Sequence, residues 1–343
     1  MSVSRPGLRD DARDDARHMD QALVLARRGL GNTWPNPAVG CVIIRDGVVV
    51  GRGWTQPGGR PHAEVMALAQ AGAAARGATA YVTLEPCAHH GKTPPCAEAL
   101  VRAGIACVVS ALTDPDPRVA GRGHAILRAA GVEVREGVRA DMARALQQGF
   151  LSRITRGRPM LTLKLANSFD GRIATASGES QWITGPEARR HTHMLRLIHD
   201  AVMVGGGTAR ADRPALNVRG FGPVRQPVRI VVSASDLPEM PAEDGDHGPL
   251  WQLSGPPEAV MAELGRRGLT RVFCEGGGEL AASLLRAGLV DRLVGYTAGV
   301  ALGADGRPSV AGLGLAHLAD APRFRLIETR RLGADVLHLW QRD

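Results

Sequence analysis

Residues 62–64 read His-Ala-Glu, and residues 86–96 read Pro-Cys-Ala-His-His-Gly-Lys-Thr-Pro-Pro-Cys. The side chains of His62, Cys87 and Cys96 are of the kind that bind Zn²⁺ and leave a fourth coordination position open for water. Water in that position loses a proton near neutral pH. Glu64 follows the histidine at an expected helix start, where its carboxylate can move a proton without being a ligand. This stretch therefore predicts a hydrolytic zinc site.

Other interpretations of the same residues stay open. The zinc site could be closed and structural, with His89 or His90 as the fourth ligand. Any one cysteine taken alone could be a buried apolar thiol. Asn36, between Pro35 and Pro37, could be a turn residue or could hold a substrate ring. The position of Glu64 favours catalysis, because a structural zinc site has no use for a carboxylate beside it.

Around these motifs, helical and strand-like patterns alternate after one hairpin, as in an α/β protein. The hairpin is expected at Val39–Ile44 and Val48–Gly53, around Asp46-Gly47. Other helices of the first half are expected near 19–29, 62–75, 96–103, 123–130 and 139–150, and strands at 80–84 and 106–111. In the second half, strands are expected at 160–166, 201–204, 228–233, 271–274, 293–297 and 324–329, and helices at 186–198, 257–267 and 278–287.

The pattern divides the chain into two domains. We expect a disordered, Arg- and Asp-rich tail at residues 1–18 and a first α/β domain at 19–152. A basic linker at 153–159, with one Gly and one Pro, leads to a second α/β domain at 160–343. A length of 343 residues suits two domains of ordinary size.

Composition excludes several classes of protein. The net charge of +8 and the pI near 10 are typical of nucleic-acid-binding proteins. However, the arginines are spread along the chain among acids, and only 3% of residues are aromatic, so we expect no nucleic-acid partner. No apolar run is long enough for a membrane helix, and the charged N-terminus is unlike a signal peptide. Five cysteines do not suggest a disulfide framework, so we expect a cytoplasmic protein with no membrane partner.

Two glycine clusters of the second half each follow an expected strand. They are Gly205-Gly206-Gly207-Thr208 and Gly276-Gly277-Gly278, and the second opens an expected helix. Backbone N–H groups at such a helix start can bind a phosphate. Taken alone, each cluster is more typical of a tight turn.

Together, the motifs resemble one family, the bifunctional riboflavin-biosynthesis deaminase–reductases. In the first half the resemblance rests on Pro35–Cys41, His62–Glu64 and Thr83–Cys96. In the second half it rests on these segments, in order: Lys164–Gly171, Gly178–Thr184, Gly205–Thr208, Ala211–Pro214 and Glu275–Gly278. The eight residues between Cys87 and Cys96 distinguish this pattern from cytidine and tRNA-adenosine deaminases. The resemblance implies a cytidine-deaminase-like α/β/α sandwich followed by a dihydrofolate-reductase-like α/β domain.

For the first half, the resemblance implies hydrolytic deamination of 2,5-diamino-6-(5-phosphoribosylamino)pyrimidin-4-one. His62, Cys87 and Cys96 would bind the zinc ion, and Glu64 would be the proton shuttle. The implied substrate contacts are Asn36, His89 and Lys92.

For the second half, the resemblance implies NADPH-dependent reduction of the ribosyl side chain to ribityl. The implied cofactor contacts are Ala166, Trp182, Thr208, Asp212, Gly276, Gly277 and Gly278. The implied substrate contacts are Ser180, Arg196, Leu216, Arg219 and Glu275. Lys164 is the candidate for polarising or protonating the substrate, and a homo-oligomer, dimer or tetramer, is expected.

Two departures from the family pattern concern cofactor binding: Arg213 stands where a second acid is usual, and Ala234 where a serine is usual. Two rival functions remain. One is a nucleoside or tRNA deaminase joined to an unrelated nucleotide-binding domain, which the long Cys87–Cys96 spacing opposes. The other is a non-catalytic, zinc-stabilised binding protein, which Glu64 opposes.

Overall fold

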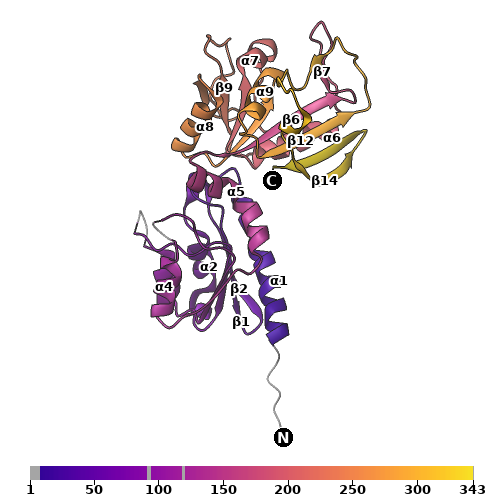
Figure 1. The fold of residues 1–343 in the computed structure, drawn as a ribbon. Coiled ribbons are helices and arrows are strands. Elements are labelled where there is room, and N and C mark those ends of the chain that lie inside the picture. Colours follow the sequence, from indigo (N-terminus) through magenta and orange to yellow (C-terminus); the bar gives the residue numbers. More distant parts are fainter. Residues whose placement is uncertain (1–7, 91–93, 118–119, 343) are drawn as a thin grey trace. The chain divides into compact units, whose positions relative to one another are not determined.

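The computed structural model describes residues 8–90, 94–117 and 120–342 (Figure 1). The chain divides into two compact units, Met1–Arg156 and Gly157–Asp343. Each unit contains one main sheet with helices packed on it, which confirms the expected two-domain α/β class. None of the helices in the described residues combines the length and apolar composition that a bilayer crossing requires.

The first unit is an α/β/α sandwich. Its helices are α1 (Leu8–Ala26), α2 (Ala63–Ala71), α3 (Cys96–Arg102), α4 (Arg122–Ala129) and α5 (Ala140–Arg156). Its strands are β1 (Gly40–Arg45), β2 (Val48–Trp54), β3 (Thr79–Val82), β4 (Cys107–Ser110) and β5 (Glu133–Glu136). The sheet order is β2-β1-β3-β4-β5, with β1 antiparallel to both neighbours and β3, β4 and β5 parallel.

Glycines show which helix covers which face of this sheet. A Cβ on Gly40 of β1 would lie 1.9 Å from the backbone oxygen of Ala22 in α1. A Cβ on Gly53 of β2 would lie 2.1 Å from the backbone oxygen of Ala63 in α2. Gly53 pairs with Cys41 and faces the same side of the sheet as Cys41. Gly40, the residue before Cys41, faces the opposite side. The two helices therefore lie on opposite faces, each in direct contact with sheet backbone.

Two expectations for the ends of this unit are wrong. Helix α1 begins at Leu8, so residues 8–18 are not a disordered tail, while residues 1–7 lie outside the described part. The helix is held because the buried Asp15 carboxylate accepts hydrogen bonds from Tyr81 Oη at 2.8 Å and Arg135 Nη1 at 3.2 Å. Helix α5 runs on to Arg156, through half of the expected linker. Its last buried residue is Ser152, and in the exposed last turn Thr155 and Arg156 donate hydrogen bonds back to Leu151 and Ser152.

The second unit is built on an eight-stranded sheet, and two further short strands pair with each other outside it. Its strands are β6 (Met160–Ser168), β7 (Arg172–Ala174), β8 (Ala201–Gly205), β9 (Val228–Val232), β10 (Leu250–Leu253), β11 (Arg271–Gly276), β12 (Arg292–Ala298), β13 (Arg307–Pro308), β14 (Arg325–Leu332) and β15 (Asp335–Gln341). Its helices are α6 (Pro186–Leu197), α7 (Gly206–Asp212), α8 (Pro257–Arg266) and α9 (Gly278–Arg286). The main sheet runs β10-β9-β8-β11-β6-β12-β15-β14.

Strands β10 to β12 of that order are parallel, and β15 and β14 are antiparallel. Parallel strands buried on both faces are continuous apolar runs, which is why β8, β9 and β11 were expected from the sequence. Glu275 and Gly276 end strand β11, and in the neighbouring strand β6 Lys164 lies at the middle and Ala166 nearer the carboxyl end. In open parallel sheets, ligands bind at this edge.

Candidate active sites

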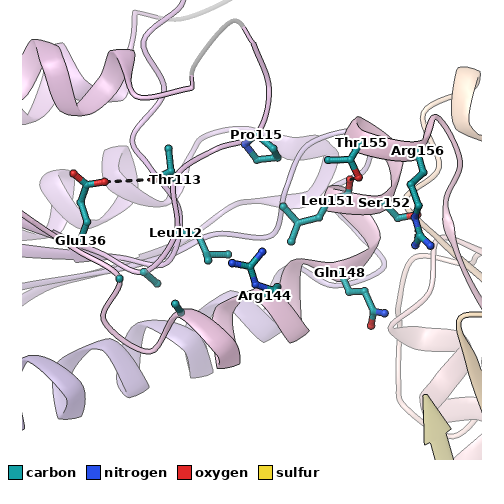
Figure 2. Close-up of a pocket in the computed structure, with 13 residues that line it drawn as sticks. Leu112, Thr113, Pro115, Glu136, Arg144, Gln148, Leu151, Ser152, Thr155 and Arg156 are labelled. Atoms are coloured by element: carbon teal, nitrogen blue, oxygen red, sulfur yellow. Dashed lines mark hydrogen bonds between the residues drawn. The ribbon is translucent and has the colours of Figure 1, made fainter. Parts of the chain in front are cut away.

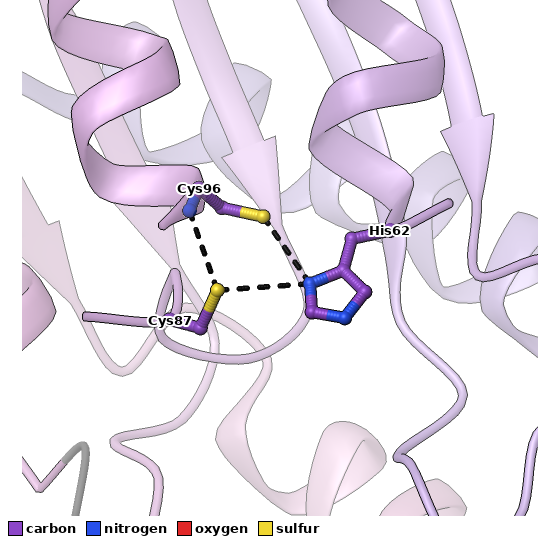
Figure 3. Close-up of side chains that lie close together, drawn as sticks. All are labelled: His62, Cys87 and Cys96. Carbon is purple, nitrogen blue, oxygen red and sulfur yellow. Dashed lines mark hydrogen bonds between the residues drawn. The ribbon is translucent and has the colours of Figure 1, made fainter. Parts of the chain in front are cut away.

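Three side chains of the first unit converge on one point, and Figure 3 shows them. His62 is the N-cap of α2, Cys96 is the first residue of α3, and Cys87 lies in the segment between β3 and α3. His62 Nδ1 lies 3.3 Å from Cys96 Sγ and 3.6 Å from Cys87 Sγ. All three donor atoms lie within 4.8 Å of one another.

This group fits a zinc ion. Tetrahedral zinc with bonds of 2.0–2.3 Å holds its ligand atoms about 3.5 Å apart. Hydrogen bonds with Cys96 and His62 lower the pKa of Cys87 to about 4, although burial acts in the opposite direction. A thiolate is the form in which cysteine binds metals. Among the described residues, neither His89 nor His90 joins the group, so the closed structural site has no fourth ligand there.

The Glu64 carboxyl lies beside this group in the first turn of α2, with only 3% of the residue exposed. Burial and the Cys87 thiolate raise the pKa of Glu64 to about 7. Its carboxylate interacts with the Cys96 thiol but is not one of the three convergent donors. A buried carboxyl with this pKa can take up and release a proton near neutral pH.

A cavity of about 620 Å³ opens in front of the group, and its lining includes His62, Glu64 and Cys87. Asn36 and His89, both expected as substrate contacts, line the same cavity. The buried His89 Nδ1 has no hydrogen-bond partner among the described residues, so it can bond to a ligand. Lys92, the third expected contact, lies outside the described residues.

Sequence reasoning missed four charged residues that line this cavity: Arg60, Asp114, Asp116 and Arg153. Arg60 precedes the zinc motif closely and could have been found by its position. The two aspartates lie far from it in sequence, in a loop whose backbone N–H groups bond to the buried Glu85 carboxylate. No motif marked that loop.

A second cavity, of about 280 Å³, lies in the second unit. It is lined by most of the residues expected to contact cofactor and substrate: Lys164, Ala166, Ser180, Trp182, Arg196, Thr208, Asp212, Arg219, Glu275, Gly276 and Gly277. Two expected residues are not in the lining. Leu216 is 2% exposed and packs in the apolar core with Val204, and Gly278 begins α9 directly behind the cavity wall.

A charged cluster forms one wall of this second cavity. Arg196 donates from Nε to Glu275 Oε1 and from Nη2 to Oε2 at 3.0 Å, and Lys164 Nζ lies 3.6 Å from Oε2. Burial raises the pKa of Glu275, but attraction to Arg196 and Lys164 outweighs burial and lowers it to about 2. The carboxylate therefore stays ionised and holds both cations at the cavity wall.

The other wall is formed by glycine backbone and an exposed indole. Gly276 and Gly277 have φ values of 92° and 94°, and a Cβ on Gly277 would lie 2.8 Å from Thr208 Oγ1. Both positions need glycine, and they lead into the N-terminus of α9, where N–H groups favour phosphate. Trp182 is 67% exposed, with the Arg189 guanidinium 4.6 Å from the ring centroid.

His193 is a member of this cavity that the sequence did not reveal. It lies on α6, one turn before Arg196, and helical histidines carry no signal of their own. Its Nδ1 lies 3.1 Å from the Asn217 backbone oxygen and 3.2 Å from the Arg219 backbone nitrogen. Burial, with Arg196 and Arg219 nearby, lowers the pKa of His193 to about 4, so the imidazole is neutral near pH 7.

A third cavity, of about 610 Å³, lies in the first unit between α5 and the segment from Ala111 to Pro115 (Figure 2). Its polar groups bond mainly to the protein itself: Thr113 donates to Glu136, Thr155 donates to the Leu151 backbone oxygen, and Arg156 donates to Ser152. It contains none of the convergent metal donors. We assign it no chemistry.

Two family models match most of the chain. Residues 12–112 match the cytidine and deoxycytidylate deaminase zinc-binding region, and residues 159–338 match the RibD C-terminal domain. The riboflavin biosynthesis protein RibD of Escherichia coli strain K12 is 44% identical, over 95% of this chain and 99% of its own length.

Solved structures agree as well. Form 1 of Acinetobacter baumannii RibD is 40% identical and superposes with a TM-score of 0.88, covering 96% of this chain and 99% of that one. A diaminohydroxyphosphoribosylaminopyrimidine deaminase/5-amino-6-(5-phosphoribosylamino)uracil reductase from Thermotoga maritima is 32% identical, with a TM-score of 0.86, over 97% and 100% of the two chains. The chain belongs to the RibD family of riboflavin-biosynthesis enzymes and joins a zinc-binding deaminase domain to an NADPH-using reductase domain.

Proposed function

We propose that His62, Cys87 and Cys96 hold the zinc ion of the deaminase and that Glu64 is its proton shuttle. The observation that carries this proposal is the convergence of three donor atoms within 4.8 Å, beside the buried Glu64 carboxyl. A zinc ion with an open fourth position supplies an activated water. Glu64 accepts the proton of that water and delivers it to the departing amine.

Asn36, His89 and Lys92 are proposed to hold the diaminopyrimidinone substrate. The Asn36 amide both donates and accepts hydrogen bonds, as an aminopyrimidinone edge requires. The His89 Nδ1 atom is available for one such bond. Lys92 would neutralise the 5-phosphate of the ribosyl group. Such contacts would suit a phosphorylated pyrimidine rather than a polynucleotide.

In the reductase domain, we propose that NADPH binds Ala166, Trp182, Thr208 and Asp212, and the backbone of Gly276, Gly277 and Gly278. The positive φ angles of Gly276 and Gly277, and the start of α9 behind them, support a phosphate contact there. The Trp182 indole presents an exposed apolar face beside that contact. NADPH supplies the hydride.

The substrate of the reductase domain is proposed to contact Ser180, Arg196, Leu216, Arg219 and Glu275. Since the Leu216 side chain is buried, its contact would come from the backbone. Opening of the aminosugar gives an imine, whose C1′ accepts the hydride while its nitrogen takes up a proton. Lys164 is the proton donor at that nitrogen, and Glu275 fixes the ammonium from 3.6 Å.

A coupled assay tests both halves. The purified chain is given 2,5-diamino-6-(5-phosphoribosylamino)pyrimidin-4-one, and ammonia release and NADPH oxidation are followed together. We expect one ammonia per NADPH consumed, with ammonia release preceding oxidation, and zinc in the purified chain. Zinc-free protein that still releases ammonia, or release without NADPH oxidation, contradicts one half of the proposal. An RNA oligonucleotide as alternative substrate should release no ammonia.

We further propose that the chain works as a homo-oligomer in the cytoplasm. None of the five cysteines forms a disulfide, as a reducing compartment favours. Strand β14 is the edge of the second sheet and is exposed along all but its last residue, with Leu326 and Ile327 at 46% and 44% exposure. A long exposed edge strand can pair with another chain. Light scattering should give a multiple of 36.2 kDa, and a monomer would contradict this.

A further inference from the structure

The Asn36 side chain lies directly on the backbone of Gly59. A Cβ on Gly59 would lie 1.9 Å from Asn36 Nδ2, 2.7 Å from Cγ and 2.9 Å from Cβ. Gly59 is buried and has a φ of +83°. Both its backbone conformation and the lack of space around it require glycine. Any side chain at this position must displace the Asn36 amide.

Backbone hydrogen bonds hold the two loops that meet here. In the first loop, Asn36 N–H donates to the Thr33 oxygen at 3.0 Å. In the second loop, Gly59 N–H donates to the Gln56 oxygen at 2.9 Å. The loops are joined by Gly58 N–H, which donates to the Asn32 oxygen at 2.8 Å. Because both backbones are held, a clash at Gly59 falls on the Asn36 side chain.

The segment that contains Gly59 also carries the reacting groups. Three residues after Gly59 the chain reaches His62, and Glu64 follows in the first turn of α2. Asn36, His62 and Glu64 line the same cavity. The segment thus sets where the Asn36 amide lies relative to the metal-binding group and the proton shuttle.

We propose that Gly59 is a positioning residue of the deaminase, which seats the Asn36 amide against the pyrimidine ring of the substrate. The proposal rests on the function proposed above. It assigns Gly59 no contact with the reacting atoms. Its effect passes through Asn36, so it should appear in substrate binding and leave the metal and the reductase domain unchanged.

The test compares Gly59→Ala with Gly47→Ala. Gly47 lies in the β1–β2 hairpin at a similar φ of +75°, and a Cβ there meets nothing within 4 Å. Both variants should lose thermal stability, because alanine is strained at positive φ. Only Gly59→Ala should raise the KM for ammonia release, by about tenfold, as expected for the loss of one good hydrogen bond to substrate. Zinc content and NADPH oxidation on supplied deaminated substrate should match those of the wild type.

Asn36→Gly, alone and combined with Gly59→Ala, completes the test. Asn36→Gly clears all three short contacts, so the double variant should fold and bind zinc even where Gly59→Ala alone does not. Its KM should equal that of Asn36→Gly. An unchanged KM in a folded Gly59→Ala, or a further rise in the double variant, overturns the proposal. A wild-type chain that releases no ammonia instead refutes the proposed function.

Discussion

Lys164 is one of only two lysines in a chain with 40 arginines. It lies in β6 next to Glu275, whose two oxygens are already held by Arg196. The ammonium is compact and can give up a proton, whereas a guanidinium is bulky and always charged. A lysine kept against such an arginine-rich background is therefore consistent with a proton donor.

Lys164→Arg preserves the charge and tests that role. We expect the kcat of NADPH oxidation to fall about a hundredfold, the usual contribution of a positioned acid, with ammonia release unchanged. Steady-state kinetics of both activities measure the effect. Lys92→Arg is the companion variant, and it should affect ammonia release alone. If both variants retain both activities, the two lysines reflect coding bias.

His199 is buried in the second unit and is kept neutral there. Its Nδ1 donates to the Leu195 oxygen at 2.7 Å, and its Nε2 accepts from Thr162 Oγ1 at 3.0 Å. Burial, with Arg271 and Arg292 nearby, lowers the pKa of His199 to about 3. The unfolded chain takes up this proton below about pH 6.5, whereas the folded chain does not. Stability is therefore full above pH 6.5 and falls as the pH drops toward 3.

Because of this linkage, His199→Gln should reduce the loss of unfolding free energy at acid pH. Between pH 6.5 and 5 the wild type should lose about 1.5 kcal/mol of unfolding free energy through this residue. Glutamine can keep both hydrogen bonds but does not titrate. Calorimetry at the two pH values measures the difference, with the exposed His317→Gln as control. Equal pH dependence of all three proteins would contradict the assignment.

At the residue scale, the deaminase motif is short and its chemistry demands particular residue types, so the sequence could predict that three candidate zinc donors and Glu64 lie together. It could not predict Arg60, Asp114 or His193, since nothing local distinguishes them from surface residues. Leu216 was expected in the site, but its side chain is buried in the core. Positions outside a motif depend on folding that brings distant segments together.

At the element scale, α2 begins with His62 as its N-cap and carries Glu64 in its first turn. The distance between this helix and the sheet depends on Gly53. Gly53 of β2 faces the start of α2, where a Cβ would lie 2.1 Å from the Ala63 oxygen and 2.7 Å from the Ala67 nitrogen. A methyl group there must push the helix away. The position of the metal donor His62 therefore depends on a glycine in a neighbouring strand.

Gly53→Ala should cost about 3 kcal/mol of unfolding free energy, at the upper end of overpacking effects. It should also weaken zinc binding, because the helix start moves with His62. Urea unfolding and zinc competition with a chelator measure the two effects. The open position Gly47 is the control, where alanine should cost about 1 kcal/mol and leave zinc affinity unchanged. Unchanged zinc affinity in Gly53→Ala would show that α2 does not move.

The sequence predicted most helices and buried strands well, because periodicity and glycine boundaries mark them. It missed five strands, of which β5, β7, β10 and β13 have four residues or fewer and β15 has seven. It also missed helix α7, whose first two residues are glycines and whose sequence is more typical of a turn. It placed the start of α1 too late, since the charged face of that helix looks like a disordered tail. The hydrogen bonds of Asp15 with Tyr81 and Arg135 distinguish this helix from a disordered tail, and they form only in the folded domain.

For the whole molecule, alternation of helix and strand predicted two α/β domains, but not strand order or the antiparallel β15 and β14. Those depend on long-range pairing that no local pattern encodes. Each domain has its own cavity: the first contains candidate zinc donors, and the second contains Lys164 and Glu275. The deaminated product of the first domain is the substrate of the second, so the activities should be separable by single substitutions.

Glu64→Gln tests this account most directly. Zinc content, ammonia release and NADPH oxidation on supplied deaminated substrate are measured on one preparation of the full chain. Zinc and NADPH oxidation should remain at wild-type levels, while ammonia release falls by at least about a hundredfold. Lys164→Arg should give the reverse pattern. Normal ammonia release by zinc-loaded Glu64→Gln, or loss of both activities, would contradict the account.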